Sequence, residues 1–164
     1  VVEIPVCYGG AFGPDLAEVA AFAGCAEDDV IARHAAGRYR VYMLGFLPGF
    51  PFMGDLPERL RLPRRSQPRV RVPAGSVALA TGLTAIYPWE SPGGWHLLGR
   101  CPVPLFDARR AAPSLLAAGD TVRFNPVSAE ECRALEAGLR NGDIDPMQWL
   151  LASPAADSLT EDAA

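Results

Sequence analysis

The sequence contains no lysine, and all 15 of its basic residues are arginine. A P-loop needs a lysine that reaches the nucleotide phosphates, so this motif is excluded. The pattern G-x-G-x-x-G of dinucleotide-binding folds is absent as well. If the protein uses a nucleotide, we expect it to be held by a partner or, in an unfamiliar way, by an arginine-rich segment.

Signals for metal sites, membranes and secretion are also missing. The four cysteines lie far apart and form no C-x-x-C pair, and there are only two histidines, so the sequence predicts no metal site. We expect four buried thiols in a reducing cytoplasm.

Proline or glycine interrupts each apolar run before the roughly 18 residues that a membrane helix needs. The first residues lack the basic and apolar regions of a signal peptide, which favours a cytoplasmic protein.

Proline and glycine are abundant, with 16 of each in 164 residues. They divide the chain into short pieces, which predicts a mainly β fold with a few short helices. The net charge of −4 argues against a nucleic-acid-binding domain, because such domains are usually basic. We expect residues 1–127 to form one domain, 128–151 a helical extension and 152–164 a disordered tail.

Hydrophobic spacing predicts the order of the main elements. Tyr39, Val41 and Met43 alternate with polar residues, so we expect these three side chains on the buried face of a strand. His34 ends a helix, where we expect it to act as a favourable cation. Ser128 and Glu131 have the spacing of a capping box. The predicted strands cover residues 2–8, 39–43, 76–80, 84–87 and 121–124, and the predicted helices begin near residues 14, 27 and 129.

Two loops and one arginine-rich segment are candidates for function. The loop 44–54 carries Phe46, Phe50 and Phe52, which are too apolar to leave in water as one patch, so they belong to the core or to an interface. The loop 88–95 is either a binding surface or a well-packed corner of the β domain. Six arginines fall within thirteen positions, namely Arg59, Arg61, Arg64, Arg65, Arg69 and Arg71.

The arginine-rich segment has several interpretations. Guanidinium groups suit the carboxylate or phosphate of a small substrate, and they equally suit an acidic partner surface. Nucleic acid is less favoured because the chain is acidic overall. The simplest alternative is a solvated ribbon whose aliphatic stems pack on the core.

A hydrolase triad would need Ser91 and His96 together with Asp107 or Glu90. The motif G-x-S-x-G of many serine hydrolases is absent, so the sequence disfavours such a triad. We therefore assign no catalytic residue from the sequence, and the catalytic residues stay unknown at this point.

Six motifs together resemble one bacterial family. They are Gly45–Pro51 (GFLPGFP), Pro63–Arg65 (PRR), Val72–Val77 (VPAGSV), Ile86–Pro88 (IYP), Ser91–Trp95 (SPGGW) and Leu98–Arg100 (LGR). From residue 2 to about 127 the chain resembles the B-type subunit of the prokaryotic 5-oxoprolinases. The same family includes allophanate hydrolase subunit 1 and the Kip-type inhibitors of a sporulation histidine kinase.

The resemblance implies a cyclophilin-like β-barrel. It also implies a smaller α/β domain ahead of the barrel in family members. Since the chain does not begin with methionine, we expect it to be the C-terminal domain of a longer protein.

The resemblance further implies a subunit of an ATP-dependent amidohydrolase that acts on 5-oxoproline or allophanate. Its active site would be shared with a cyclophilin-like subunit of type C, and a third, LamB-like subunit is implied as well. ATP would be a co-substrate of the complex and not held by this chain alone. The main alternative is a regulatory module that inhibits a sensor histidine kinase. A peptidyl-prolyl isomerase is less favoured, because a barrel alone does not determine function.

For the site, we expect a pocket at the mouth of the barrel that binds a small anion. A guanidinium would pair with a carboxylate, and a glycine pair would expose backbone N–H groups. Trp95 would form a wall and Ser91 would donate a hydrogen bond. The expected substrate-binding residues are Arg64, Arg65, Ser91, Gly93, Gly94 and Trp95, and the expected partner interface consists of Phe46, Phe50 and Phe52.

Overall fold

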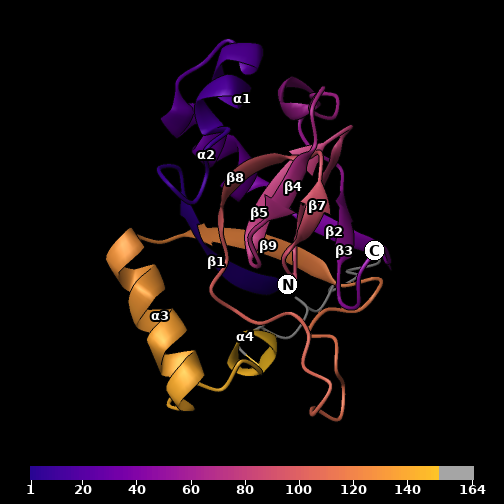
Figure 1. The fold of residues 1–164 in the computed structure, drawn as a ribbon, viewed down its shortest axis with the longest axis vertical. Coiled ribbons are helices and arrows are strands. Elements are labelled where there is room, and N and C mark those ends of the chain that lie inside the picture. The colour runs from indigo at the N-terminus through magenta and orange to yellow at the C-terminus, as the bar shows by residue number, and fades with distance from the viewer. Residues whose placement is uncertain (152–164) are drawn as a thin grey trace, which may run out of the picture.

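The computed structural model of the protein describes residues 1–151 and contains a closed barrel of seven strands (Figure 1). Neighbouring strands follow the order β1-β8-β5-β6-β3-β2-β9, and β4 and β7 form a separate two-stranded sheet. The mainly β prediction is confirmed, and the barrel fits a cyclophilin-like fold. The strands are β1 Val2–Tyr8, β2 Tyr39–Leu44, β3 Pro51–Gly54, β4 Arg69–Val72, β5 Ser76–Ala80, β6 Leu83–Ile86, β7 Ser91–Gly93, β8 His96–Arg100 and β9 Thr121–Pro126.

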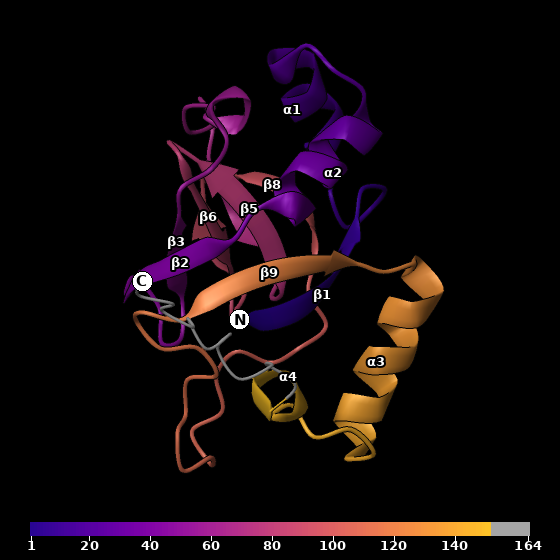
Figure 2. The same ribbon diagram turned by 180° about the vertical axis from the view of Figure 1, so that it is seen from behind.

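The helices lie at the two ends of the barrel. Helices α1 (Leu16–Ala23) and α2 (Glu27–Ala36) pack at one end, and α3 (Ala129–Asn141) and α4 (Gln148–Leu151) lie at the other (Figures 1 and 2). A short 3₁₀ turn covers Glu58–Leu60. The partly buried side chains of Met147, Trp149 and Leu150 pack against the main hydrophobic core.

Local signals in the sequence set several element boundaries. Helix α1 ends at Gly24, whose φ of 68° is the left-handed conformation that glycine adopts at low cost. At the start of α3, the Ser128 hydroxyl accepts from the Glu131 N–H at 3.1 Å, and the Glu131 carboxylate accepts from the Ser128 N–H at 2.8 Å. The predicted capping box is therefore confirmed.

The predicted burial of Met43 is wrong, because 53% of its surface is exposed. Val41 pairs with Met53 and Met43 pairs with Phe52, so Tyr42 is an extra residue in β2. Such a β-bulge shifts the side-chain alternation by one position. Tyr42 and Met43 consequently both face solvent, whereas Tyr39 and Val41 are buried as expected.

The predicted role of His34 as a helix-end cation is also wrong. The imidazole is fully buried, and burial lowers its pKa to about 3, so the ring is neutral. Its Nδ1 accepts from the Tyr8 hydroxyl at 2.7 Å. The Thr84 hydroxyl donates to the Ala78 carbonyl, so it accepts from His34 Nε2–H at 2.9 Å. The neutral ring thus joins α2 to β1 and β6.

Other expectations concern the thiols, membranes and domains. Cys7, Cys101 and Cys132 are buried and Cys25 is partly buried, and all four are free thiols. Within residues 1–151, no helix is long and apolar enough to cross a bilayer. The predicted disordered tail, 152–164, lies outside the described residues. The division at residue 127 stays a prediction.

The burial of neutral His34 predicts a loss of stability in mild acid. Because its pKa falls from 6.5 to about 3 on folding, the unfolded chain binds a proton that the folded chain does not bind. Stability should be highest above pH 6.5 and decline as pH falls toward 3. We expect a loss of about 2 kcal/mol between pH 6.5 and pH 5, measured by urea unfolding.

His34→Gln should flatten this dependence, although it lowers stability at every pH. His96→Gln, which keeps His34, should retain the steep decline. An unchanged pH slope in His34→Gln would show that His34 does not cause the acid sensitivity.

Candidate functional site

The candidate site lies on the outer face of strands β5, β6 and β8. Val77 and Leu79 of β5 face the main core, whereas Ala78 and Ala80 face a second apolar cluster. Both faces of β5 are therefore covered, which explains its continuous run of apolar residues. The second cluster contains Phe50, Val72, Ala78, Ala80, Ala85, Tyr87, Trp95 and Leu97.

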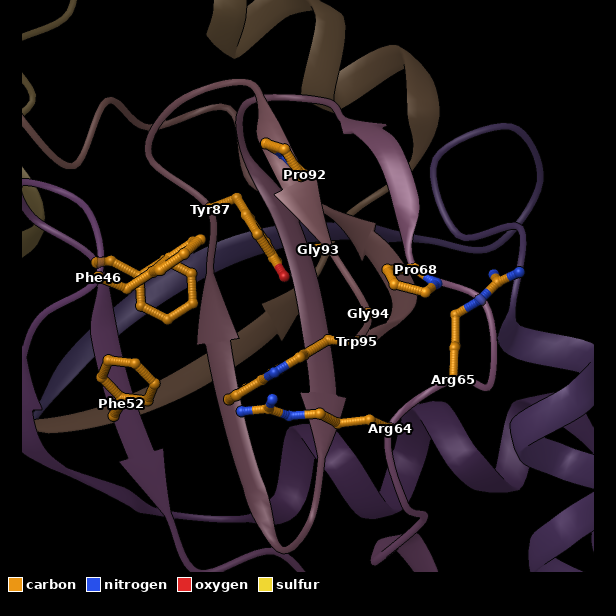
Figure 3. Close-up of a pocket in the computed structure, with 11 residues that line it drawn as sticks. Phe46, Phe52, Arg64, Arg65, Pro68, Tyr87, Pro92, Gly93, Gly94 and Trp95 are labelled. Atoms are coloured by element: carbon orange, nitrogen blue, oxygen red, sulfur yellow. The ribbon is translucent and has the colours of Figure 1, made fainter.

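A pocket of about 420 Å³ lies against this second cluster (Figure 3). Its walls come from the aromatic loop after β2, the arginine-rich segment before β4, and the segment around β7. The lining residues are Phe46, Phe50, Phe52, Arg64, Arg65, Pro68, Tyr87, Pro92, Gly93, Gly94 and Trp95.

Five of the six expected substrate-binding residues line this pocket. The exception is Ser91, which is buried and donates its hydroxyl to the Pro92 carbonyl at 3.2 Å. Ser91 therefore does not line this pocket, and its role in substrate binding stays a prediction. The other five are Arg64, Arg65, Gly93, Gly94 and Trp95.

The three phenylalanines expected at a partner interface line the same pocket. Phe50 is only 2% exposed, so it belongs to the core of this chain. Phe52 is partly buried, and Phe46 is 66% exposed. Of the three, Phe46 has the surface that a partner or ligand can contact, and the interface itself stays a prediction.

Tyr87 also lines the pocket, although it was not predicted from the sequence. Figure 3 shows its hydroxyl directed into the pocket. Burial raises the pKa of this phenol, while the positive charges of Arg64 and Arg69 lower it in part. The motif Ile86–Pro88 at the end of a predicted strand is the signal that could have identified it.

Arg65 is held by the buried carboxylate of Asp15. Its Nη1 donates to Asp15 Oδ1 at 2.7 Å. Arg69 donates two further bonds to the same carboxylate at 2.6 and 2.7 Å, and the Leu97 N–H adds one at 2.7 Å. Burial alone would raise the pKa of Asp15, but the bonds from Arg69 and Leu97 and the two arginine charges lower it. Arg65 and Arg69 are therefore structural cations.

Arg64 differs from both of these arginines. The backbone around it is fixed, because His96 Nε2–H donates to the Pro63 carbonyl at 2.9 Å and the Arg65 N–H donates to the Gly94 carbonyl at 2.7 Å. Within the described chain, the guanidinium of Arg64 has neither an ion pair nor a hydrogen bond. Figure 3 shows it directed toward the aromatic side of the pocket, whereas Arg65 points away. Arg64 can therefore bind an anion in the pocket.

The hydrolase triad that the sequence disfavoured is not assembled. His96 is bonded to the Pro63 carbonyl and Ser91 to the Pro92 carbonyl. Asp107 is paired with Arg109 at 3.0 Å, and Glu90 lies 3.8 Å from Arg71. In residues 1–151, no group of three or more His, Cys, Asp and Glu side chains could hold a metal ion.

The two glycines of the pocket have different roles. Neither has a positive φ, so a left-handed conformation does not explain them. A Cβ on Gly93 would lie 2.3 Å from the Tyr87 hydroxyl oxygen, whereas a Cβ on Gly94 would lie 3.7 Å from its nearest neighbour, in Pro68. Gly93 is therefore required for the close approach of the Tyr87 hydroxyl.

Gly93→Ala should displace the Tyr87 ring from its packed position and destabilise the protein. We expect a loss of about 1–3 kcal/mol, as for other overpacked sites, in chemical unfolding. Gly94→Ala is the matched control and should change stability by less than about 0.5 kcal/mol. Equal effects of the two substitutions would contradict the special role of Gly93.

Comparison with known proteins gives one family and several relatives. Residues 1–116 match the model of the carboxyltransferase domain, subdomains C and D. The chain is 51% identical over 134 residues to the B-type subunit of 5-oxoprolinase from Bacillus subtilis (strain 168). This alignment covers 82% of this chain and 56% of that protein. It is 52% identical to the corresponding 5-oxoprolinase subunit of Escherichia coli O157:H7, covering 80% of this chain and 60% of the relative. The chain thus spans just over half the length of these curated relatives.

Solved structures share the fold. A conserved uncharacterized protein of Pyrococcus horikoshii is 49% identical, with a TM-score of 0.77 over 80% of this chain and 61% of that one. The urea amidolyase of K. lactis aligns with a TM-score of 0.72 over 92% of this chain and 11% of its own length. Its identity is only 20%, so that likeness concerns the fold alone.

Proposed function

Because the chain belongs to the family of carboxyltransferase subdomains C and D, we propose that it is the barrel domain of the B-type subunit in an ATP-dependent 5-oxoprolinase. The observation that carries the proposal is the unpaired Arg64 in an aromatic pocket. About half of the aligned residues are identical to those of two curated 5-oxoprolinase subunits, which supports the substrate class. Allophanate, the other substrate implied by the family resemblance, is a smaller anion without a ring to pack on these aromatic walls.

The pocket matches the chemistry of 5-oxoproline, a compact cyclic amide that carries a carboxylate. The Arg64 guanidinium would pair with the carboxylate through two parallel hydrogen bonds. The Trp95 and Phe52 rings would cover the apolar part of the five-membered ring. The Tyr87 hydroxyl, directed into the same space, would donate to the amide carbonyl oxygen.

The remaining catalytic groups are assigned to partner subunits. Hydrolysis of an amide needs a group that activates water or ATP, and in residues 1–151 the pocket lining contains no carboxylate, cysteine or histidine. We assign this role to a cyclophilin-like subunit of type C, with a LamB-like subunit as a third component. ATP binds outside this chain, which carries no phosphate-binding motif. Inhibition of a histidine kinase would not account for an inward-facing Arg64.

Reconstitution of the complex tests this function. The full-length subunit should form glutamate from 5-oxoproline in the presence of ATP only when its partner subunits are added, since its own pocket lacks an activating group. Amino-acid analysis of the product and measurement of ADP would detect the reaction. Turnover by the purified subunit alone, at a rate that the partners do not change, would refute the shared active site.

Arg64 should be essential to the reconstituted activity. Arg64→Ala removes the charge, and Arg64→Lys keeps the charge but loses the planar pair of donors. A hydrogen bond to a charged group contributes about 1.5–3 kcal/mol, so we expect kcat/KM to fall roughly ten- to hundredfold in both variants. Arg71→Lys, at an exposed position that does not line the pocket, is the control and should retain full activity. Wild-type kinetics in both Arg64 variants would remove this residue from the site.

A further inference from the structure

Phe46 has a backbone conformation that residues with a Cβ rarely adopt. Its φ is 68°, and the Leu47 N–H donates to the Gly45 carbonyl at 2.8 Å. A hydrogen bond over three residues with a positive φ at the centre defines the strained form of the γ-turn. Glycine would fit this position without strain, yet the chain places a large aromatic residue there.

The surrounding loop holds Phe46 in this conformation. The Phe50 N–H donates to the Leu47 carbonyl at 3.0 Å, and the Gly45 N–H donates to the Phe50 carbonyl at 3.1 Å. Pro48 and Gly49, whose φ is 79°, are the central residues of the turn that the first of these bonds closes. The conformation of Phe46 is therefore built into a closed loop.

Folding gains little from the side chain of Phe46. Its ring contacts Phe50 edge to face, with ring centroids 5.4 Å apart, but 66% of the residue stays exposed. Backbone strain costs stability, and so does leaving a large apolar side chain in water. Strained residues concentrate at functional sites, and exposed apolar surface often marks a binding site. Figure 3 places Phe46 on one side of the pocket, with Trp95 and Arg64 on the other.

The size of the pocket indicates what Phe46 does. Small-molecule sites usually cover most of the ligand surface. A single small ring fills only part of 420 Å³, so a ring that packs on Trp95 needs a second side chain to cover its other face, and Phe46 lies across the pocket from Trp95. We propose that Phe46 contacts the ligand and restricts the pocket to compact anions with a flat apolar face. Arg64 binds the charge and Trp95 packs on the opposite face of the ring. That the ligand is 5-oxoproline rests on the proposed function. That Phe46 selects ligands by their shape rests on the geometry of the pocket.

Two substitutions of Phe46 separate ligand contact from backbone strain in the full-length protein. Phe46→Gly and Phe46→Ala both remove the ring, so both should weaken the binding of 5-oxoproline and of benzoate roughly tenfold in calorimetry. The affinity for the larger 2-naphthoate should fall less or rise. Only glycine accepts the positive φ freely, so Phe46→Gly should melt about 2–4 °C above Phe46→Ala.

Thr81 offers a matched control, because it is the other residue with a Cβ and a positive φ within the described residues, at 53°. It lies in the turn between β5 and β6 and does not line the pocket. Thr81→Gly should likewise melt above Thr81→Ala. Both Thr81 variants should bind the three carboxylates as the wild type does.

The outcomes distinguish this inference from the proposed function. If the wild type binds benzoate but not 5-oxoproline, and the Phe46 variants lose benzoate, the proposed substrate is wrong and the role of Phe46 is supported. If the variants bind 5-oxoproline like the wild type, the role of Phe46 is refuted. If they keep carboxylate binding but no longer co-elute with the partner subunits, Phe46 is an interface residue and the inference is overturned. A wild type that binds none of the three carboxylates refutes both proposals.

Discussion

The buried carboxylate of Asp15 is the constraint on which the candidate site depends. A carboxylate removed from water is costly unless donors replace the lost hydration, and Asp15 receives four hydrogen bonds of 2.6–2.7 Å. These donors come from the arginine-rich segment and from β8, while Asp15 itself precedes α1. One side chain thus ties three distant parts of the chain together. Arg65 and Arg69 neutralise it, which leaves Arg64 available to a ligand.

Elements defined by neighbouring residues could be predicted from the sequence. The left-handed Gly24, the capping box at Ser128 and the hairpin formed by β5 and β6 all depend on residues a few positions apart. Most of the pocket was predictable for a different reason. Nine of its eleven lining residues fall within short motifs of the resembled family, although nothing local in those motifs shows that they meet in space.

The errors arose where distant residues decide the outcome. Asp15 looks like an ordinary acid in a first helical turn, because its arginine partners lie 50 and 54 positions further on. His34 looks like a helix-end cation, but burial keeps the ring neutral, and the Thr84 hydroxyl that fixes its tautomer is also 50 positions away. The bulge at Tyr42, which exposes Met43, has no local signal in the sequence. Contacts between residues so far apart follow no period along the sequence, so hydrophobic spacing does not reveal them.

The pairing of β1 with β9 has a consequence for the synthesis of the chain. Residues 2–6 pair in parallel with residues 122–126, so the first strand of the barrel must wait for the last strand of the barrel. Until β9 emerges from the ribosome, β1 and β2 each present an open edge, and open edges recruit strands of other chains. Such long-range closure is slow, because the entropy of a long loop is lost before the contacts form. A chain that stopped before residue 121 would lack this last strand and would leave β1 and β2 unpaired at the edges that β9 covers.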